Sequence, residues 1–539
     1  MSEIDLWMNQ RQVTPERQAI ARAVLAEIES GLDVMRATRR HPLPEGGYIP
    51  KSVLVAVYRD MLAAGEREED PALLARLRTK PVRTLSGVTT VTVLTKPYPC
   101  PGKCVFCPTD ARMPKSYLPD EPGAMRGVQN AFDPYKQVRS RLDALEANGH
   151  PTEKIELLIL GGTWSSYRRD YQEWFVKRCF EAMNGVESET LEDAQVLNEN
   201  AAHRNVGLVI ETRPDEIDAR ELVWLRRLGV TKVQMGAQSL DDRVLELNKR
   251  GHTAAETLRA TAMLRAAGFK IVLHWMPNLM GATIDSDRAD FARLWEPPAL
   301  GGGYAPDELK IYPCQLLANA ELYEYWQRGE YTPYTQEELV GLIADIKPSV
   351  PVYCRINRII RDIPSTNVVA GNRRTSLRMD VTEELNRRGT RCSCIRCREV
   401  RGEAVDADAL RLVDTVYPAA QAEEHFLQFV TPDDKIAGYL RLSLPGADAP
   451  DLSESLPDLR GAALVREVHV YGQSLGVGEE QAGAAQHIGL GAALLEKAAE
   501  IAAAHGYSSL AVIAAVGTRC YYERRGFERG ALYHVMRLD

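Results

Sequence analysis

The most informative stretch of this sequence is VTTVTVLTKPYPCPGKCVFCP, residues 88–108. Its first nine residues are rich in β-branched side chains, which is typical of a β-strand. Cys100, Cys104 and Cys107 follow in the spacing C-x3-C-x2-C. Three thiolates can hold three irons of a cubane cluster and leave the fourth iron open. A zinc knuckle is the alternative, but it requires a fourth ligand, and no candidate lies nearby in the sequence.

Six later stretches have the same strand character, and helical stretches such as 215–228, 254–267 and 335–346 separate most of them. The six are IELLILGG (155–162), GLVIET (207–212), KVQMGA (232–237), KIVLHWMP (270–277), ELKIYP (308–313) and VYCRI (352–356). A repeated strand–helix–strand order predicts a parallel sheet covered by helices. Six or seven such units predict a partial (β/α) barrel over residues 81–360. Catalytic loops follow the strands of such a barrel, and the three cysteines lie in one of them.

This arrangement resembles the radical S-adenosylmethionine (SAM) superfamily. The resemblance implies that Cys100, Cys104 and Cys107 ligate a [4Fe-4S] cluster whose open iron binds SAM. Gly161 and Gly162, in LILGGT, are similar to the family's segment beside the methionine moiety. Glycine suits such a site because the backbone must approach the ligand closely, although a plain turn is the alternative.

A second group of cysteines lies in an arginine-rich connector, which we place at residues 361–420. RCSCIRC contains Cys392, Cys394 and Cys397. A closed tetrahedral zinc site needs one more ligand, and we favour Cys314, which ends a predicted barrel strand. Such a Zn²⁺ ion would attach the connector to the barrel. Unligated thiols and a second iron–sulfur cluster are the alternatives.

Residues 421–539 have shorter strands and a glycine-rich turn that opens into a helix. The turn is QHIGLG, with Gln486, Gly489 and Gly491. The free N–H groups and the dipole of a helix start can bind a pyrophosphate. The order of strand, turn, helix, strand and late tyrosine resembles the GNAT acyl-CoA-binding fold. The predicted fold class is α/β, a partial (β/α) radical SAM barrel fused to an α+β GNAT acyltransferase domain.

Residues 1–80 are predicted to form an N-terminal helical appendage. Thr14 and Pro15 are a good helix start, with a cap followed by proline in the first turn. Gly46 and Gly47 interrupt the helical pattern before a second helix from about Ser52 to Ala64. This region has twelve basic and twelve acidic residues, so charge alone does not mark it as a tRNA-binding region.

The pairing of a radical SAM domain with a GNAT domain resembles the catalytic subunit of the Elongator complex, the tRNA carboxymethyluridine synthase family, in its bacterial or archaeal stand-alone form. The similarity extends from about Lys80 to the end of the chain. The stretches that carry it are CPGKCVFCP, EKIELLILGGTW, ETRPDEI, KVQMGAQS, LKIYP, RDIPS, REVHVYG, QHIGLG and VGTRCYY.

The resemblance also implies roles for single residues. Those expected to contact acetyl-CoA are Lys154, Glu467, Val468, His469, Val470, Leu490, Gly491, Ala492 and Tyr522. Tyr521 and Tyr522 stand where a GNAT tyrosine faces the thioester. The catalytic residues so implied are Lys154, Glu467, Tyr521 and Tyr522. Lys310 and Tyr312 are expected to face the barrel interior and to contact SAM or the substrate.

The expected activity is carboxymethylation of carbon 5 of a tRNA wobble uridine by a radical derived from SAM, with acetyl-CoA as donor. Such a reaction requires the two domains to pack face to face and requires an electron donor. One alternative is a protein lysine acetyltransferase with a structural iron–sulfur cluster, in which Glu467 would be the general base. A non-catalytic tRNA-binding scaffold is another.

Charge and composition restrict these expectations further. The net charge is −8, so any tRNA contact must come from a local patch. Residues 355–398 hold eleven Arg, no Lys, two Asp and two Glu, a local charge of 11 − 4 = +7. Ordinary ion pairs are the alternative interpretation of these arginines. No apolar run of membrane length and no secretion signal are present, so we expect a cytoplasmic protein. A homodimer is compatible with these expectations.

Overall fold

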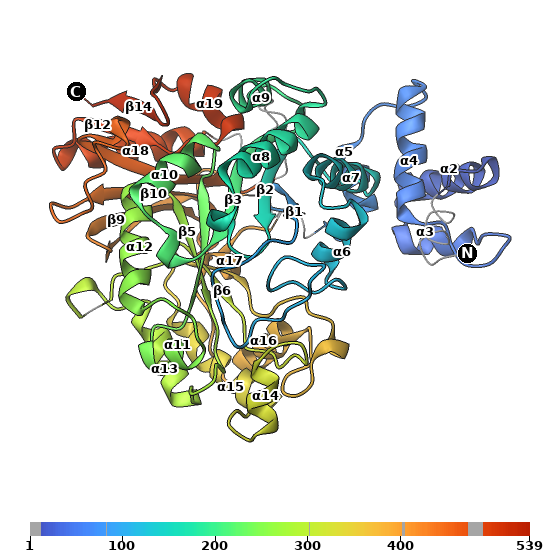
Figure 1. Cartoon of the computed structure of the whole chain (residues 1–539). Helices are drawn as coiled ribbons and strands as arrows, with labels where there is room; N and C mark the ends of the chain where they lie inside the picture. Colours follow the sequence, from blue (N-terminus) through green and yellow to red (C-terminus); the bar gives the residue numbers. More distant parts are fainter. Residues whose placement is uncertain (1–11, 82–83, 301, 402–404, 473–488, 539) are drawn as a thin grey trace.

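Seven parallel strands form one sheet in sequence order. Figure 1 shows how this sheet curls. The computed structural model describes residues 12–81, 84–300, 302–401, 405–472 and 489–538. The strands are β1 (Thr89–Leu94), β2 (Lys154–Leu160), β3 (Arg204–Thr212), β4 (Lys232–Gln238), β5 (Lys270–Trp275), β6 (Glu308–Ile311) and β7 (Arg355–Arg358). Because β1 and β7 are the two edges of this sheet, it is an open partial barrel. The predicted strands all overlap observed ones.

Helices cover the outer face of this sheet, between the strands. They are α6 (Pro122–Gln129), α7 (Pro134–Ala147), α8 (Arg169–Asn184), α9 (Leu191–Asn198), α10 (Ala219–Arg227), α11 (Asp242–Leu247), α12 (Ala254–Ala266), α13 (Ile284–Arg293), α14 (Leu322–Gln327) and α15 (Gln336–Ile346). Thr253 begins α12 with a capping box to Glu256. Helix α10 starts later than the predicted residue 215, because Pro214 begins a short 3₁₀ turn and the Asp218 side chain then caps the helix.

Four N-terminal helices form a separate small core beside α7, and Figure 1 shows them projecting from the barrel. They are α2 (Pro15–Glu29), α3 (Val34–Arg40), α4 (Lys51–Ala63) and α5 (Pro71–Leu77). The predicted helix start is confirmed, since the Thr14 side chain accepts a hydrogen bond from the Arg17 backbone N–H. Gly46 and Gly47 both have positive φ in the predicted break. Within the described ranges, no helix is both long and apolar enough to cross a membrane.

The connector after β7 contains α16 (Leu377–Arg387) and α17 (Ile395–Arg398). It is shorter than predicted, because β8 (Arg411–Ala419) already belongs to the C-terminal sheet and pairs along its whole length with β9 (Ala422–Val430). The predicted boundary at residue 421 is therefore wrong. Residue 421 lies in the turn of the hairpin formed by β8 and β9. The strand pattern of the sequence starts again after this turn, so in the sequence the turn resembles a domain boundary.

The C-terminal sheet has the order β13-β14-β12-β11-β10-β9-β8. Its remaining strands are β10 (Ile436–Pro445), β11 (Ala462–Val470), β12 (Ser509–Val512), β13 (Glu528–Arg529) and β14 (His534–Arg537), with helices α18 (Leu490–Ala504) and α19 (Arg519–Glu523). Neighbouring strands are antiparallel except β11 and β12. This parallel pair separates after Val465 and Val512, whereas β11 continues to Val470 along β10. The separation opens a gap in the sheet.

The C-terminal sheet packs against the amino-terminal ends of the barrel strands. Apolar residues of both parts belong to one continuous core. Asp307, just before β6, is fully buried and pairs with Arg466 of β11 and Arg441 of β10. The rings of Tyr353 and Tyr417 stack across the same boundary at 3.6 Å. The prediction that the two domains pack face to face is confirmed.

Candidate active site

The cysteine loop follows β1 at the carboxyl end of the barrel strands. Thr163 Oγ1 lies 3.4 Å from the Cys100 sulfur, and the Arg250 guanidinium donates to the Cys104 sulfur at 3.6 Å. Burial and the charge of Cys104 raise the pKa of the Cys107 thiol to about 12. A bound metal would therefore have to replace a proton at this sulfur.

Two buried arginines beside the loop fit an anionic cluster. Arg213 and Arg250 are each about 5% exposed or less. Arg213 Nη1 and Arg250 Nε have no hydrogen-bond partner among the described residues. Buried donors without a partner are costly, and the sulfides and thiolates of an iron–sulfur cluster would accept from them. The donor set and its surroundings thus fit the predicted [4Fe-4S] cluster.

Two glycines follow β2, and the surroundings that a side chain would meet differ between the two positions. Gly161 has φ +142°, and a Cβ there would lie 1.7 Å from Thr95 Oγ1, so close packing alone requires glycine. Gly162 has φ +85°, and a Cβ there would lie 3.4 Å from the Lys115 carbonyl oxygen. A role of either glycine in binding SAM remains a prediction.

A cavity of about 980 Å³ runs from the cysteine loop through the barrel interior to the C-terminal sheet. Cys107 and Tyr117 line it at one end, and Glu467, His469 and Tyr522 at the other. Between them, alternate residues of the strands point inward. The polar lining residues on the strands β1 to β7 are Thr89, Thr90, Thr92, Glu156, Glu211, Lys232, Gln234, Gln238, Lys270, His274, Glu308, Lys310, Arg355, Asn357 and Arg358.

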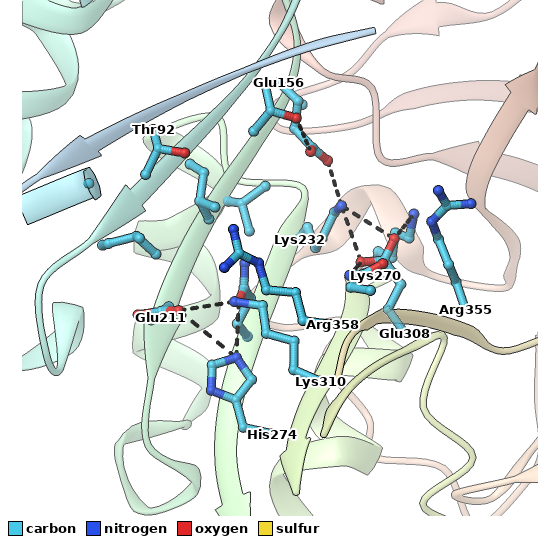
Figure 2. A pocket seen from close by; sticks show the side chains of 18 of the residues that line it. Thr92, Glu156, Glu211, Lys232, Lys270, His274, Glu308, Lys310, Arg355 and Arg358 are labelled. Carbon is cyan, nitrogen blue, oxygen red and sulfur yellow. Dashed lines mark hydrogen bonds and ion pairs between the residues drawn. The ribbon is translucent and has the colours of Figure 1, made fainter. Parts of the chain in front are cut away.

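The interior charges form two groups, which Figure 2 shows along the cavity. In the group near the cysteine loop, Lys310 Nζ lies 3.3 Å from Glu211 Oε1, and the Tyr117 hydroxyl donates to Glu211 Oε2 at 2.8 Å. Burial holds the pKa of the neighbouring His274 well below its usual value, so this imidazole is neutral. The expectation that Lys310 and Tyr312 face the barrel interior is confirmed, since both line the cavity.

The second group lies at the amino-terminal ends of the strands. Lys232 pairs with Glu156 at 2.5 Å and Lys270 with Glu308 at 2.6 Å. The sequence interpretation missed these residues, although a signal was present. Charged side chains recur at every second position of otherwise apolar strands, as at Glu308 and Lys310, and such positions share one face.

Glu467 connects this second group to the C-terminal sheet. Its carboxylate pairs with Lys270, accepts from the Tyr439 hydroxyl at 2.8 Å and accepts from Arg441 Nε at 2.9 Å. Burial alone would raise its pKa, but Lys270 and Arg441 hold the pKa at about 2. A general base works best with a pKa near the operating pH. Glu467 is therefore not the free base that the lysine acetyltransferase alternative requires.

The gap between β11 and β12 brings the other predicted C-terminal residues together. Val468 and His469 of β11 line the cavity, as does Tyr522 of α19. Gly489 has φ +74° and begins α18. A Cβ on Gly491 would lie 2.5 Å from the Tyr521 hydroxyl and 3.8 Å from the Val470 side chain. Leu490 and Ala492 are in the same helical turn, whereas Gln486 lies outside the described residues.

Lys154 opens β2 at the end of the barrel that faces the C-terminal sheet. Burial lowers its pKa, and the charge of Arg204 adds to this effect. Lys154 in turn contributes to the low pKa of His469, about 3, which burial mainly causes. The charge of Lys154 therefore acts on His469, although a whole barrel separates the two residues in the sequence.

The second cysteine group is only partly as predicted. The sulfur atoms of Cys392, Cys394 and Cys397 lie within 4.8 Å of one another, close to the separation of about 3.8 Å expected around one Zn²⁺ ion. Cys314 is not among them. It is buried in a separate apolar cluster and shares a hydrogen bond with Tyr331. The prediction that Cys314 is the fourth ligand is wrong, because the loop after β6 pairs with Val368 and Val369 of the connector and not with its cysteine segment.

The arginine-rich segment is largely occupied by internal ion pairs. Seven of its eleven arginines pair with carboxylates, namely Arg355, Arg358, Arg361, Arg374, Arg387, Arg388 and Arg398. These pairs agree with the alternative interpretation of the local positive charge, in which the arginines make ordinary ion pairs and do not form a tRNA-binding patch. Arg358 and Arg361 nevertheless line the cavity on the side of the cysteine loop, together with Arg126.

Comparison with known proteins agrees with this architecture. Residues 98–294 match the Radical SAM superfamily, and residues 306–387 match the Radical_SAM C-terminal domain. The protein named tRNA uridine(34) acetyltransferase from Dehalococcoides mccartyi (strain CBDB1) is 44% identical over 463 residues, covering 85% of this chain and 99% of that protein. Elongator complex protein 3 from Danio rerio is 34% identical over 498 residues, covering 89% of each chain.

A solved structure extends the similarity to three dimensions. The archaeal Methanocaldococcus infernus Elp3 with an N-terminal deletion superposes with a TM-score of 0.72 at 36% identity, covering 84% of this chain and 100% of that chain. The family resemblance found in the sequence is thus confirmed. The chain is a radical SAM protein and belongs to the family of the tRNA uridine(34) acetyltransferases and Elongator complex protein 3.

Proposed function

We propose that this protein carboxymethylates carbon 5 of the wobble uridine of tRNA, with acetyl-CoA as carbon donor and SAM as radical source. The relatives' name, tRNA uridine(34) acetyltransferase, supports the substrate and its position. The observation that carries the rest is the cavity, because it joins the cysteine loop to the gap in the C-terminal sheet. We propose that this sheet and α18 are a GNAT domain that holds acetyl-CoA.

The residues along the cavity support a position for each reactant under this proposal. When bound at Cys100, Cys104 and Cys107, a reduced [4Fe-4S] cluster would supply the electron that cleaves SAM. Gly489 to Ala492 at the start of α18 would bind the pyrophosphate of CoA, because the first N–H groups of a helix lack backbone partners. Tyr522 and His469 would then border the thioester, so that the acetyl group points along the barrel interior.

The interior side chains would orient the reactants and keep water out. In the overall reaction, the radical derived from SAM takes one hydrogen atom from the acetyl methyl group, and the methyl carbon bonds to carbon 5 of the uracil. Carbon 5 then loses its hydrogen as a proton, one electron returns to replace the electron that cleaved SAM, and hydrolysis of the thioester releases CoA. Glu211, itself bonded by Tyr117, holds the ammonium group of Lys310, a residue that is 7% exposed and lines the central cavity. Its positive charge suits the carbonyl oxygens of the thioester and of the uracil.

Replacing Lys310 with methionine should lower the rate of uridine modification about 10²-fold, because a preorganised charge at a reacting oxygen contributes roughly this much. The methionine keeps most of the side-chain volume. Turnover at saturating tRNA and acetyl-CoA is the measurement. Lys497→Met, on the exposed face of α18, is the matched control and should change turnover less than threefold. Equal turnover in the two variants would remove Lys310 from the reaction.

Two further assignments belong to this proposal. The N-terminal helices would bind tRNA, since Arg36, Arg39 and Arg40 are all exposed on the single helix α3. The sulfur atoms of Cys392, Cys394 and Cys397 would hold a Zn²⁺ ion and so brace the connector against β7. The backbone N–H of Ile395 already donates to the carbonyl oxygen of Cys354, the residue just before β7. An external electron donor would reduce the cluster.

The test is a reconstituted reaction. Full-length protein with an anaerobically restored cluster is given SAM, a reductant, acetyl-CoA labelled with ¹³C in both acetyl carbons, and unmodified tRNA with a wobble uridine. Mass spectrometry of the nucleosides should find carboxymethyluridine with both labelled carbons, and only when SAM is present. If instead a lysine peptide is acetylated without SAM and no modified uridine forms, the protein is a lysine acetyltransferase and the proposal is wrong.

A further inference from the structure

A second group of potential metal ligands lies on the C-terminal domain, away from the cavity. Glu423 and His425 are two positions apart on β9, so their side chains share one face of the sheet. His505 caps the carboxyl end of α18 and approaches the same place. One ligand atom from each of the three residues lies within 4.8 Å of the other two. None of these residues lines the cavity or has a role in the proposed reaction.

The distances match those around a tetrahedral transition-metal ion. Glu423 Oε1 lies 3.3 Å from His425 Nε2 and 3.4 Å from His505 Nε2. Metal–ligand bonds of about 2.0–2.1 Å at a tetrahedral angle separate neighbouring ligand atoms by about 3.3 to 3.4 Å. Each imidazole nitrogen therefore already lies from the carboxylate oxygen at the spacing of two ligands that share one ion, and the two nitrogens lie within 4.8 Å of each other.

The other nitrogen of each imidazole is held by an acceptor. His505 Nδ1 lies 2.8 Å from the carbonyl oxygen of Ile501, which can only accept, so this nitrogen carries the hydrogen. His425 Nδ1 lies 2.8 Å from Asp414 Oδ2 on the neighbouring strand β8. Carboxylate or carbonyl partners at Nδ1 leave the lone pair on Nε2, which is how metal-binding histidines are usually oriented. In that tautomer both Nε2 atoms would be available to ligate an ion beside Glu423 Oε1.

We propose that Glu423, His425 and His505 form a Zn²⁺ site, with Asp414 and the Ile501 carbonyl as its outer partners. The Glu423 and His505 side chains are 49% and 45% exposed, so water can supply the fourth ligand. Two imidazoles and one carboxylate are a ligand set that suits Zn²⁺. The ion would clamp the end of α18 to the β8–β9 hairpin and restrain the helix whose other end carries Gly489 and Leu490.

Zinc content of the full-length protein tests this site. Each protein is equilibrated by dialysis against micromolar free Zn²⁺ and counted by mass spectrometry. His505→Gln and Glu423→Gln should each bind one Zn²⁺ fewer than the unaltered chain. Asp414→Asn should keep the count at high Zn²⁺ but bind about 10- to 100-fold more weakly, because outer partners contribute this much affinity. These positions are partly exposed, so folding should be unaffected.

Two controls separate this site from other zinc binding. His41 lies 3.2 Å from Glu27 Oε1 but belongs to no group of three potential metal ligands among the described residues. His41→Gln should therefore bind as many Zn²⁺ ions as the unaltered chain. Cys394→Ser removes one of the three connector thiols and should leave the ion at His505 in place. The proposal fails if His505→Gln binds as much Zn²⁺ as the unaltered chain. It also fails if His41→Gln loses an equal amount, or if the ion lost in His505→Gln is already lost in Cys394→Ser.

Discussion

Replacing Cys104 with alanine is expected to lower the formation of modified uridine by more than about 10³-fold, because the whole radical step depends on the cofactor and enzymes supply 10⁶-fold or more. Cys104 is the central cysteine of the loop, and its sulfur accepts from Arg250. No other cysteine of the described chain contributes to this loop beyond Cys100 and Cys107. Two thiolates do not hold a stable cubane, so iron content should fall as well.

The measurement has three parts: iron and sulfide content, cleavage of SAM, and modified uridine by mass spectrometry. All three should fall together in Cys104→Ala. Cys179→Ala is the matched control, because Cys179 is a buried cysteine on α8 among apolar neighbours and is not part of the loop. It should retain iron and SAM cleavage. Uridine modification by a Cys104→Ala protein without iron would show that the loop is not the radical centre.

Replacing Asp307 with asparagine is expected to lower the free energy of unfolding by about 3 to 5 kcal/mol, the usual cost of breaking a buried ion pair. Asp307 is 0% exposed and accepts from Arg466 Nη2 at 2.6 Å and Nη1 at 2.8 Å. Arg441 Nη1 lies 3.4 Å from the same carboxylate. The substitution would leave two buried guanidinium groups without their main counter-charge at the boundary between the domains.

The pH dependence of this contribution follows from the direction of the pKa shift. Burial alone would raise the pKa of Asp307, but Arg466 and Arg441 hold it below its ordinary value. A depressed pKa in the folded state means that the stabilisation is complete above the unfolded pKa of about 3.9 and is lost as the pH falls below it. The difference in stability between the unaltered chain and Asp307→Asn should therefore be constant near neutral pH and shrink in acid.

Urea unfolding of both proteins, followed by tryptophan fluorescence, measures the difference. Asp285→Asn is the matched control, since Asp285 pairs with Arg288 at 2.6 Å but is 93% exposed. An exposed pair contributes only about 0 to 1 kcal/mol, so this variant should be nearly as stable as the unaltered chain. If Asp307→Asn loses no more than the control, the buried pairs do not hold the two domains together.

Much of the fold could be predicted because local patterns carry it. The β-branched runs between helical stretches place all seven barrel strands, since the period of a strand is set by its own residues. The cluster cysteines were found for a similar reason. Their spacing of three and two residues keeps them in one loop, whatever the rest of the chain does.

The sequence by itself thus determined the parallel half-barrel, the cysteine loop and the family. Only the tertiary structure decided which distant residues meet. It placed Glu467 between Lys270 and Arg441, which removed a candidate base, and it kept Cys314 away from Cys394. It also brought His505 beside His425, eighty residues earlier in the chain. The physical reason is that periodicity reports which face of an element a residue occupies, whereas contact between elements depends on how their faces pack.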